Sequence, residues 1–335
     1  MPAPRFGTFS IVAYDRGRDE WGVAVQSKFL AVGAVVPWAE VGVGALATQA
    51  LANVGYGPGG LARLRRGESA EAVVRALTSA DPKRDERQLG VVDARGGASA
   101  FTGAKCMDFA GHVVGDGFAC QGNILLSRAV VEGMARAYEA TPGDLPERLL
   151  AALAAGQREG GDRRGMQSAA LLIVRAKGGY DEGNDRWVDI RIDDHPSPIE
   201  ELRRVFRLYD LTLLTREDPA TLIRLTPEVV RGLQHDLAIL GFAPGRASGT
   251  MDDATIRAFG RFLGENNFEN KARPDATIWP SVRDYLRDRA AEESARRRRT
   301  APVVPGALDR GPGAAPPPKE APSPPGTARR TKRGG

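Results

Sequence analysis

Consecutive strand patterns joined by short turns constrain the fold of this chain more than any other feature. Residues 8–14 are rich in β-branched and aromatic side chains, residues 15–19 supply a polar turn with a glycine, and residues 21–26 return as a second strand. Residues 31–38 and 41–49 are predicted as two further strands, mostly apolar as expected for strands covered on both faces. Because strands linked by short turns pair in opposite directions, the pattern predicts antiparallel sheets rather than repeated β-α-β crossovers.

Helical and strand periods alternate along the rest of the first 210 residues. Helices are predicted at 59–66, 69–79, 127–140, 145–155 and 197–209, and strands at 88–93, 98–102, up to Cys120, 168–175 and 187–192. Ser69 is expected to cap the second of these helices, since its hydroxyl can accept a free backbone N–H. Two antiparallel sheets with helices on their outer faces make a four-layer αββα sandwich, and this is the α+β fold class that we expect.

The composition changes beyond this sandwich. Residues 225–290 are predicted as a small helical domain after a linker at 211–224. Residues 291–335 are rich in Arg and then in Pro, Gly and Ala, so a disordered tail is expected there. The tail holds ten Lys or Arg against four Asp or Glu, a net charge of +6, whereas the whole chain nets +5 and the remainder therefore −1. The basic character thus belongs to the tail, and no specific nucleic-acid partner is expected for the folded part.

Cysteine usage and the N-terminal residues bear on location. Cys106 and Cys120 can form one bridge at most, and no Cys/His cluster has the spacing of a zinc site. The first ten residues hold one Arg and no apolar segment, and no apolar run approaches the roughly 20 residues that span a bilayer. We therefore expect a cytoplasmic protein with no metal, no organic cofactor and no membrane partner, with cell-envelope association as the alternative.

The dipeptide Gly7-Thr8 precedes the first strand and is the candidate for chemistry. A threonine hydroxyl is a weak nucleophile, and no His or acid stands beside Thr8 in sequence to activate it. One known solution uses the α-amine of the same residue as the general base, which requires cleavage of the Gly7–Thr8 bond and removal of residues 1–7 as a leader. The simpler alternative is that Thr8 is only a strand residue, since threonine is common in strands.

A family resemblance supports the first alternative. The matching segments are Thr8-Phe9-Ser10-Ile11-Val12-Ala13, Gly22-Val23-Ala24-Val25-Gln26-Ser27-Lys28-Phe29, Ala31-Val32-Gly33-Ala34-Val35-Val36-Pro37-Trp38, Gln121-Gly122-Asn123, Gly161-Asp162-Arg163-Arg164-Gly165-Met166-Gln167-Ser168, Asn184-Asp185-Arg186 and Asp193-Asp194-His195-Pro196. On these segments, residues 8 to about 210 resemble the DUF1028 family, which is assigned to the N-terminal-nucleophile (Ntn) hydrolase-like fold. The resemblance implies an Ntn-hydrolase-like sandwich over residues 8–210, and the family does not by itself imply a reaction.

Proteasome β-subunits are similar at the same point, since they also begin with Gly-Thr and a hairpin. The second strand of that hairpin ends Val-Asp-Ser-Arg, where this chain has Val25-Gln26-Ser27-Lys28. Gln26 replaces an Asp that normally pairs with a Lys on the following strand, and residues 31–35 offer no Lys. Lys28 is a candidate catalytic residue if its side chain points into the site, and the alternative is a solvated lysine.

Other positions match places that Ntn enzymes use. The strand ending at Thr48 and Gln49 resembles the place where these enzymes present a backbone N–H as an oxyanion hole. Gln121 and Asn123 lie in a strand–loop–helix segment, where their amides can bind a substrate amide or steady the nucleophile. Asp162 stands where the superfamily often has an Asp and is a candidate catalytic residue. For each of these residues a cap or turn role is the alternative.

Residues 229–266 resemble a peptidoglycan-binding-like module. Its hallmarks here are Leu233-Gln234-His235-Asp236-Leu237-Ala238-Ile239-Leu240-Gly241-Phe242, Gly245, Gly249, Thr255-Ile256-Arg257-Ala258-Phe259 and Phe262. These residues predict two amphipathic helices joined by a Gly-rich loop. Ser248 replaces the usual acidic residue and Gly260 the usual Gln, so a helical core without a ligand is the alternative to binding glycan.

The leading hypothesis is an autoprocessed amidohydrolase acting on a small amide or peptide-like substrate. Thr8 Oγ would attack the amide carbonyl while the freed α-amine takes and returns the proton. The alternatives are a non-catalytic Ntn-like scaffold that binds a small metabolite, and a peptidoglycan- or cell-wall-associated binding protein that uses residues 225–290. Homo-oligomers are expected as well.

Overall fold

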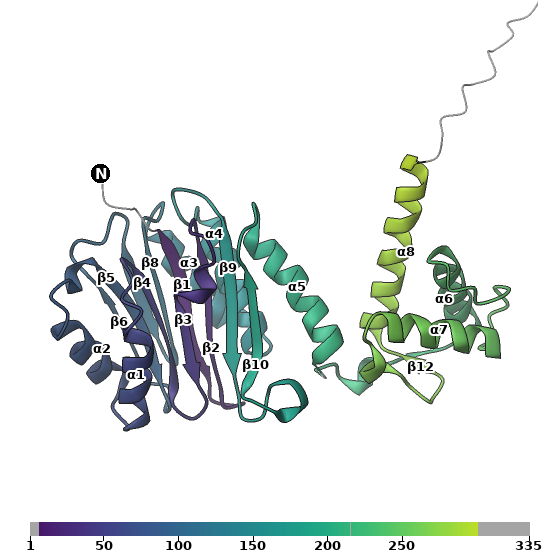
Figure 1. The fold of residues 1–335 in the computed structure, drawn as a ribbon, viewed down its shortest axis with the longest axis horizontal. Coiled ribbons are helices and arrows are strands. Elements are labelled where there is room, and N and C mark those ends of the chain that lie inside the picture. Colours follow the sequence, from purple (N-terminus) through teal and green to yellow (C-terminus); the bar gives the residue numbers. More distant parts are fainter. Residues whose placement is uncertain (1–6, 215, 301–335) are drawn as a thin grey trace, which may run out of the picture.

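The structure is a computed structural model that describes residues 7–214 and 216–300. A layered α/β part is followed by a small helical part, and α5 (Pro198–Leu213) leads from one to the other (Figure 1). The expected leader residues 1–6 and the expected tail from residue 301 onward lie outside the described residues.

The layered part is built on a six-stranded sheet in the order β10-β9-β2-β1-β8-β7. Its strands are β1 (Thr8–Asp15), β2 (Glu20–Ser27), β7 (Gly111–Gly115), β8 (Phe118–Asn123), β9 (Ser168–Val174) and β10 (Arg186–Ile192). Every neighbouring pair in it is antiparallel, as the hairpin-like connections predict. The two strands of the first hairpin occupy the centre of the sheet, so each is paired on both sides.

A second, four-stranded antiparallel sheet faces the first one. It runs in the order β3-β4-β5-β6, with β3 (Pro37–Glu40), β4 (Gly44–Ala50), β5 (Arg87–Asp93) and β6 (Ala98–Thr102). Small and β-branched side chains from both sheets interdigitate in the space between them, among them Val12, Val23, Val25, Ala45 and Ala47. Alternation along each strand sends the intervening residues outward to the helices.

Helices cover both outer faces, so the part has four layers (Figure 1). On the six-stranded sheet lie α3 (Ala129–Ala140), α4 (Leu145–Arg158) and α5, around a core that includes Phe9, Tyr138 and Trp187. On the four-stranded sheet lie α1 (Tyr56–Arg65) and α2 (Ala70–Ser79). Ser69 caps α2 as predicted, because its hydroxyl accepts the backbone N–H of Ala72 at 3.3 Å.

The expectation of a strand over residues 31–38 is wrong for residues 31–36, and only Pro37 and Trp38 belong to a strand, β3. A 3-10 turn (Val32–Ala34) occupies this segment, entered through a left-handed Ala31 with φ 53°. The backbone N–H of Val32 donates to Ser168 Oγ at 3.1 Å, which holds the turn against β9. Val32 and Val36 are nevertheless buried between the sheets. The apolar run therefore signalled burial and not an extended backbone.

Two further elements differ from the sequence expectations. Strand β7 was not expected, because glycines bound its short apolar segment; it forms the edge of the six-stranded sheet. Helix α8 (Pro280–Thr300) continues past the boundary at Ala291 where the disordered tail was expected to begin. Glu293 pairs with Arg296 at 2.7 Å and with Arg297 at 2.8 Å, and such i,i+3 and i,i+4 pairs on good helix formers extend the helix.

The helical part contains the two expected helices, α6 (Pro227–Ile239) and α7 (Asp253–Glu265), together with α8 and a small hairpin of β11 (Ile223–Arg224) and β12 (Thr277–Ile278). Thr226 and Asp252 cap α6 and α7. The core gathers Leu233, Leu237, Phe262, Phe268 and Leu286, and Leu211 of α5 joins it. The remaining 3-10 turns are Arg84–Glu86, Tyr180–Glu182, Pro219–Thr221 and Glu269–Lys271.

Candidate functional site

Thr8 stands at the head of a central strand and faces the space between the two sheets. It is the first residue of β1 and pairs with Ser27 on one side and with Asn123 on the other. Its neighbour Phe9 points into the helix-facing core, whereas Ser10 bonds to Gln49 of the opposite sheet. Strand alternation therefore puts the Thr8 side chain on the inter-sheet face, where it is only 4% exposed.

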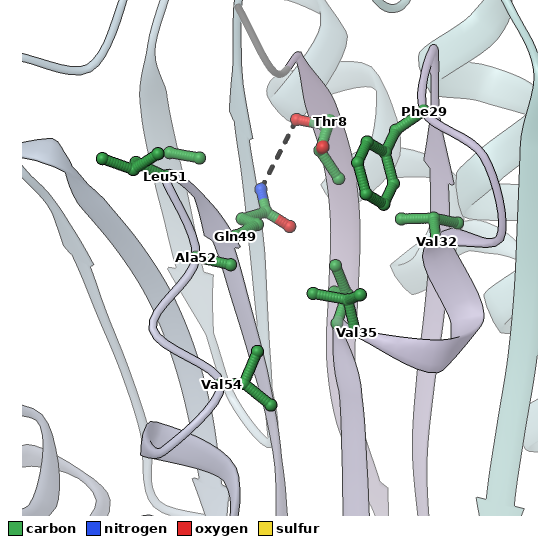
Figure 2. Close-up of a pocket in the computed structure, with 10 residues that line it drawn as sticks. Thr8, Phe29, Val32, Val35, Gln49, Leu51, Ala52 and Val54 are labelled. Atoms are coloured by element: carbon green, nitrogen blue, oxygen red, sulfur yellow. Dashed lines mark hydrogen bonds between the residues drawn. The ribbon is translucent and has the colours of Figure 1, made fainter. Parts of the chain in front are cut away.

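A pocket of about 190 Å³ opens beside Thr8 (Figure 2). Its walls are mainly apolar side chains from the turn after β2 and from the segment that follows β4, namely Phe29, Val32, Val35, Val36, Leu51, Ala52 and Val54. Gln49 contributes the amide drawn in Figure 2, whose Nε2 lies 3.4 Å from the carbonyl oxygen of Thr8. The pocket thus combines one hydroxyl with a small apolar cavity.

The peptide bond before Thr8 is held by two side chains. Ser27 Oγ donates to the carbonyl oxygen of Gly7 at 2.5 Å, and Arg164 Nη2 donates to the same oxygen at 2.8 Å. Thr8 Oγ1 lies 3.0 Å from Ser27 Oγ. The reactive hydroxyl, the carbonyl before it and two donors therefore lie within one small cluster.

Asp162 is buried directly behind this cluster. Its side chain is 0% exposed and pairs with Arg164, whose Nη2 lies 2.8 Å from Oδ2 and whose Nε lies 3.1 Å from Oδ1. The backbone N–H of Lys28 donates to Asp162 Oδ2 at 2.9 Å. A Cβ placed on Gly7 would lie 2.6 Å from Asp162 Oδ1, so the carboxylate requires a glycine at position 7.

The side chain of Lys28 does not point into the site, contrary to the condition set for its catalytic role. Lys28 is exposed, and its Nζ lies 3.3 Å from the carbonyl oxygen of Met166. The residue reaches the site only through its backbone N–H, which bonds to Asp162. The strand ends at Ser27, so the next side chain turns outward with the loop.

The backbone N–H of Thr48 is not available as an oxyanion donor. It donates to the carbonyl oxygen of Val36 at 3.2 Å, while Thr48 Oγ1 donates to the carbonyl oxygen of Asn53 at 3.1 Å. Amides two residues apart on a strand point to the same side. The pairing of β3 with β4 ends at Pro37 and Ala47. After Ala47, the edge of β4 that faced β3 is next to the pocket. By strand alternation the N–H of Ala50 points to the same side of β4 as that of Thr48, and Ala50 lines the pocket.

Gln121 and Asn123 lie in a buried amide network and do not line the pocket. Gln49 Nε2 and Asn123 Nδ2 both donate to Gln88 Oε1, at 2.8 and 2.9 Å, and Gln88 Nε2 donates to the carbonyl oxygen of Gly122 at 2.8 Å. Gln121 Nε2 donates to Ser10 Oγ at 2.7 Å. These hydrogen bonds connect β1 and β8 to the facing sheet and so fix the position of the site. Of the four amides, only that of Gln49 lines the pocket.

Sequence reasoning missed Ser27, Gln88 and Arg164 as members of the site. Ser27 and Arg164 stand inside the segments that carry the family resemblance, but nothing in those segments shows that both reach the carbonyl of Gly7. Arg164 is 157 residues away from Gly7 in sequence.

Other reactive groups lie elsewhere. Cys106 and Cys120 are both free thiols, and burial raises the pKa of Cys106 to about 11 and that of Cys120 further. Among residues 7–214 and 216–300, no three His, Cys, Asp or Glu side chains form a group that could hold a metal ion. None of the helices in these same ranges is long and apolar enough to cross a membrane.

Fold and site define a class of protein: a mixed α/β sandwich of antiparallel sheets with a threonine at the head of a central strand, extended by a small helical module. Residues 8–202 match the model of the "Family of unknown function (DUF1028)", and the chain belongs to this family. Residues 212–286 match a second family model, "Putative peptidoglycan binding domain".

A solved structure supports the family assignment. The chain is similar to the crystal structure of protein SPO2555 from Silicibacter pomeroyi, a DUF1028 protein, with 33% sequence identity and a TM-score of 0.56. The match covers 61% of this chain and 89% of the other. None of the curated proteins matches the chain.

Proposed function

We propose that the layered part is an Ntn-type amide hydrolase whose nucleophile is Thr8 after cleavage of the Gly7–Thr8 bond. The observation that carries the proposal is the position of Thr8, whose hydroxyl lines an apolar pocket at the open end of two face-to-face sheets. Four layers with antiparallel sheets at the centre are the architecture in which a strand-leading residue can serve in this way.

The residues around Thr8 supply the steps of an acyl transfer. The α-amine of Thr8 takes the proton from Oγ as the oxygen attacks the substrate carbonyl, and later returns it to the leaving amine. The amide of Ala50 stabilises the oxyanion, in the place that Thr48 was expected to fill. Asp162 and Arg164 border Gly7, next to the nitrogen that cleavage frees, and keep the new amine oriented. Water then hydrolyses the ester on Thr8.

The pocket favours a small amide or peptide-like substrate with a short apolar group. Its walls offer apolar side chains and the single amide of Gln49. A volume of about 190 Å³ and apolar walls suit a small apolar group such as a branched aliphatic chain.

The proposal is tested on the purified chain by intact mass and by turnover of a panel of short acyl anilides. We expect a species that begins at Thr8 and turnover that is strongest for branched aliphatic acyl groups. Thr8→Ala should abolish both, whereas Thr8→Ser, which keeps a hydroxyl, should retain both. A protein that keeps Gly7, or turnover that survives in T8A, would leave the non-catalytic scaffold as the function of this part.

A second candidate function belongs to the helical part, for which we propose binding of peptidoglycan-type glycan. A groove of about 670 Å³ runs between α7 and the β12 hairpin, and Ile256 at its edge is 53% exposed. Arg273, Asp275, Thr250 and Thr277 add polar groups to the apolar side chains of the lining. Retention of the full chain on insoluble peptidoglycan, and its loss in Ile256→Glu, would support binding; equal retention of both would contradict it.

A further inference from the structure

We propose that Ser27 and Arg164 are the groups that cleave the Gly7–Thr8 bond within the chain itself, with Ser27 as a proton relay and Arg164 as the electrostatic donor. This inference rests on the proposed function, because it concerns how the nucleophile is exposed. It assigns to the two residues a role that the pocket chemistry does not require.

Two donors on one carbonyl oxygen are the first observation. Ser27 Oγ and Arg164 Nη2 lie 2.5 and 2.8 Å from the oxygen of Gly7. A hydroxyl and a guanidinium on the same oxygen withdraw electrons from the carbonyl carbon and stabilise negative charge on that oxygen. The carbonyl so prepared is the one that the hydroxyl of the next residue, Thr8, can reach.

The direction of the hydrogen bonds gives the second observation. A serine hydroxyl has a single proton, and that of Ser27 is donated to the oxygen of Gly7. The 3.0 Å contact between Thr8 Oγ1 and Ser27 Oγ is therefore donated by Thr8. The protons form a chain from the attacking oxygen, through Ser27, to the carbonyl oxygen of Gly7, on which negative charge develops during the attack and which then takes the proton of Ser27.

The reaction that follows is an acyl shift and then a hydrolysis. Thr8 Oγ bonds to the carbonyl carbon of Gly7 while its proton passes to Ser27 and the proton of Ser27 passes to the carbonyl oxygen. The tetrahedral intermediate collapses as the C–N bond to Thr8 breaks, and the hydroxyl proton returns through Ser27 to the nitrogen. An ester and a free amine result. Water then cleaves the ester, which releases residues 1–7 with a carboxylate and restores the hydroxyl of Thr8.

Asp162 acts as a positioning residue in this arrangement. It holds Arg164 through Nε and Nη2 and is itself 0% exposed at the side chain. It also lies so close to Gly7 that only glycine fits there. The guanidinium is therefore held at the carbonyl by a buried carboxylate, and the peptide is held against both.

The test follows self-cleavage of the full chain over time by intact mass, in wild type, Ser27→Ala, Arg164→Met and Arg164→Lys. Loss of one oxyanion donor typically slows such a step by about 10²–10³-fold, so S27A and R164M should slow cleavage by that order. R164K keeps a positive charge but loses the planar guanidinium group that donates to both Asp162 and Gly7, so it should recover part of the cleavage rate. Arg163→Met is the matched control, because the neighbouring Arg163 is exposed and bonds to Leu125 instead; it should cleave at the wild-type rate.

A chain that begins Met-Thr8 separates this inference from the proposed function. Methionine aminopeptidase removes the Met and exposes Thr8 without self-cleavage, so its turnover tests hydrolysis alone. Wild-type cleavage rates in S27A, R164M and R164K, with folding verified by circular dichroism, would overturn the inference and leave the hydrolase intact. No turnover by the Met-Thr8 chain would instead overturn the hydrolase. If R164M does not fold, the cleavage rates of S27A and R164K still test the roles of Ser27 and Arg164.

Discussion

The two parts of the chain use buried polar side chains in opposite ways. In the layered part, Ser27 at the end of β2 and the pair Asp162 and Arg164 from one loop converge on a single peptide bond. In the helical part, the buried Gln234 of α6 donates to Thr250 and accepts from Gly249 in the following loop, and it also donates to Thr255 of α7. Buried polar groups thus surround one peptide bond, the site of the proposed cleavage, in the layered part, whereas in the helical part they hold a loop and a helix in place.

The largest expected effect tests whether the helical part is needed for the chemistry. Phe262 is 1% exposed and packs edge-on against Phe242 and Phe268. Phe262→Ala should destabilise the helical part by about 3–5 kcal/mol, because it removes a fully buried ring from that core. Calorimetry should show an early transition for this part, while intact mass shows cleavage at Gly7–Thr8 unchanged. Cleavage lost in parallel would show that the two parts act together.

The second prediction sharpens the role of the convergent cluster. Gly7→Ala places a methyl group 2.6 Å from Asp162 Oδ1, so the peptide or the carboxylate must move. Overpacking of about 1–3 kcal/mol at the reacting bond should slow cleavage roughly 10- to 100-fold, followed by intact mass. Cleavage at the wild-type rate would mean that the contact with Asp162 does not position the bond.

The third prediction concerns the opposite end of the first hairpin. Glu20 is buried, one of its oxygens has no hydrogen-bond partner, and burial raises its pKa from 4.5 to about 7 against the opposing effect of Arg175. The folded state therefore binds this proton more tightly than the unfolded state. Its stabilising contribution is complete below about pH 4.5 and is lost as the pH rises through 7.

Urea unfolding at pH 5 and pH 8 measures this contribution. Glu20→Gln should flatten the decline in the free energy of unfolding between these pH values by roughly 1–2 kcal/mol. Glu71→Gln, on the exposed face of α2, is the control and should leave the decline as in wild type. An unchanged slope in E20Q would show that Glu20 is ionised in the folded protein at both pH values.

The smallest expected effect returns to the helical part. Gly260 lies inside α7, and a Cβ there would meet nothing within 4 Å. Gly260→Ala should raise the free energy of unfolding by roughly 0.5–1 kcal/mol, since glycine is unfavourable within a helix. Gly57→Ala in α1 is the contrasting variant, because its Cβ would overlap the ring of Trp38 and should destabilise the layered part. A destabilised G260A would indicate that something packs on this face of α7.

Local pattern predicted the sandwich better than it predicted the site. The alternation of residues 8–14 and 21–26 located β1 and β2, and the serine at position 69 located the start of α2. The run 31–38 misled, because burial in a turn leaves the same apolar signature as burial in a strand. Thr8 was selected as a site candidate because it follows Gly7 at the start of the first strand, and Asp162 because of the family resemblance. Which side chains face them depends on strand register and on a loop more than 150 residues away, as Arg164 illustrates, and no local pattern encodes that.

The central position of β1 in the six-stranded sheet bears on how the protein would resist exopeptidases after the proposed cleavage. Chain ends usually fray, and exopeptidases act on ends that can be drawn out. The N-terminus that the proposed cleavage would create is Thr8, which lies inside a sheet and pairs with Ser27 on one side and with Asn123 on the other. The backbone hydrogen bonds of β1 to β2 and β8 would therefore hold this N-terminus, and aminopeptidases would find no unpaired strand to bind. Under the proposed cleavage, removal of residues by aminopeptidases would therefore require unfolding of the sheet, because the N-terminal strand is paired on both sides.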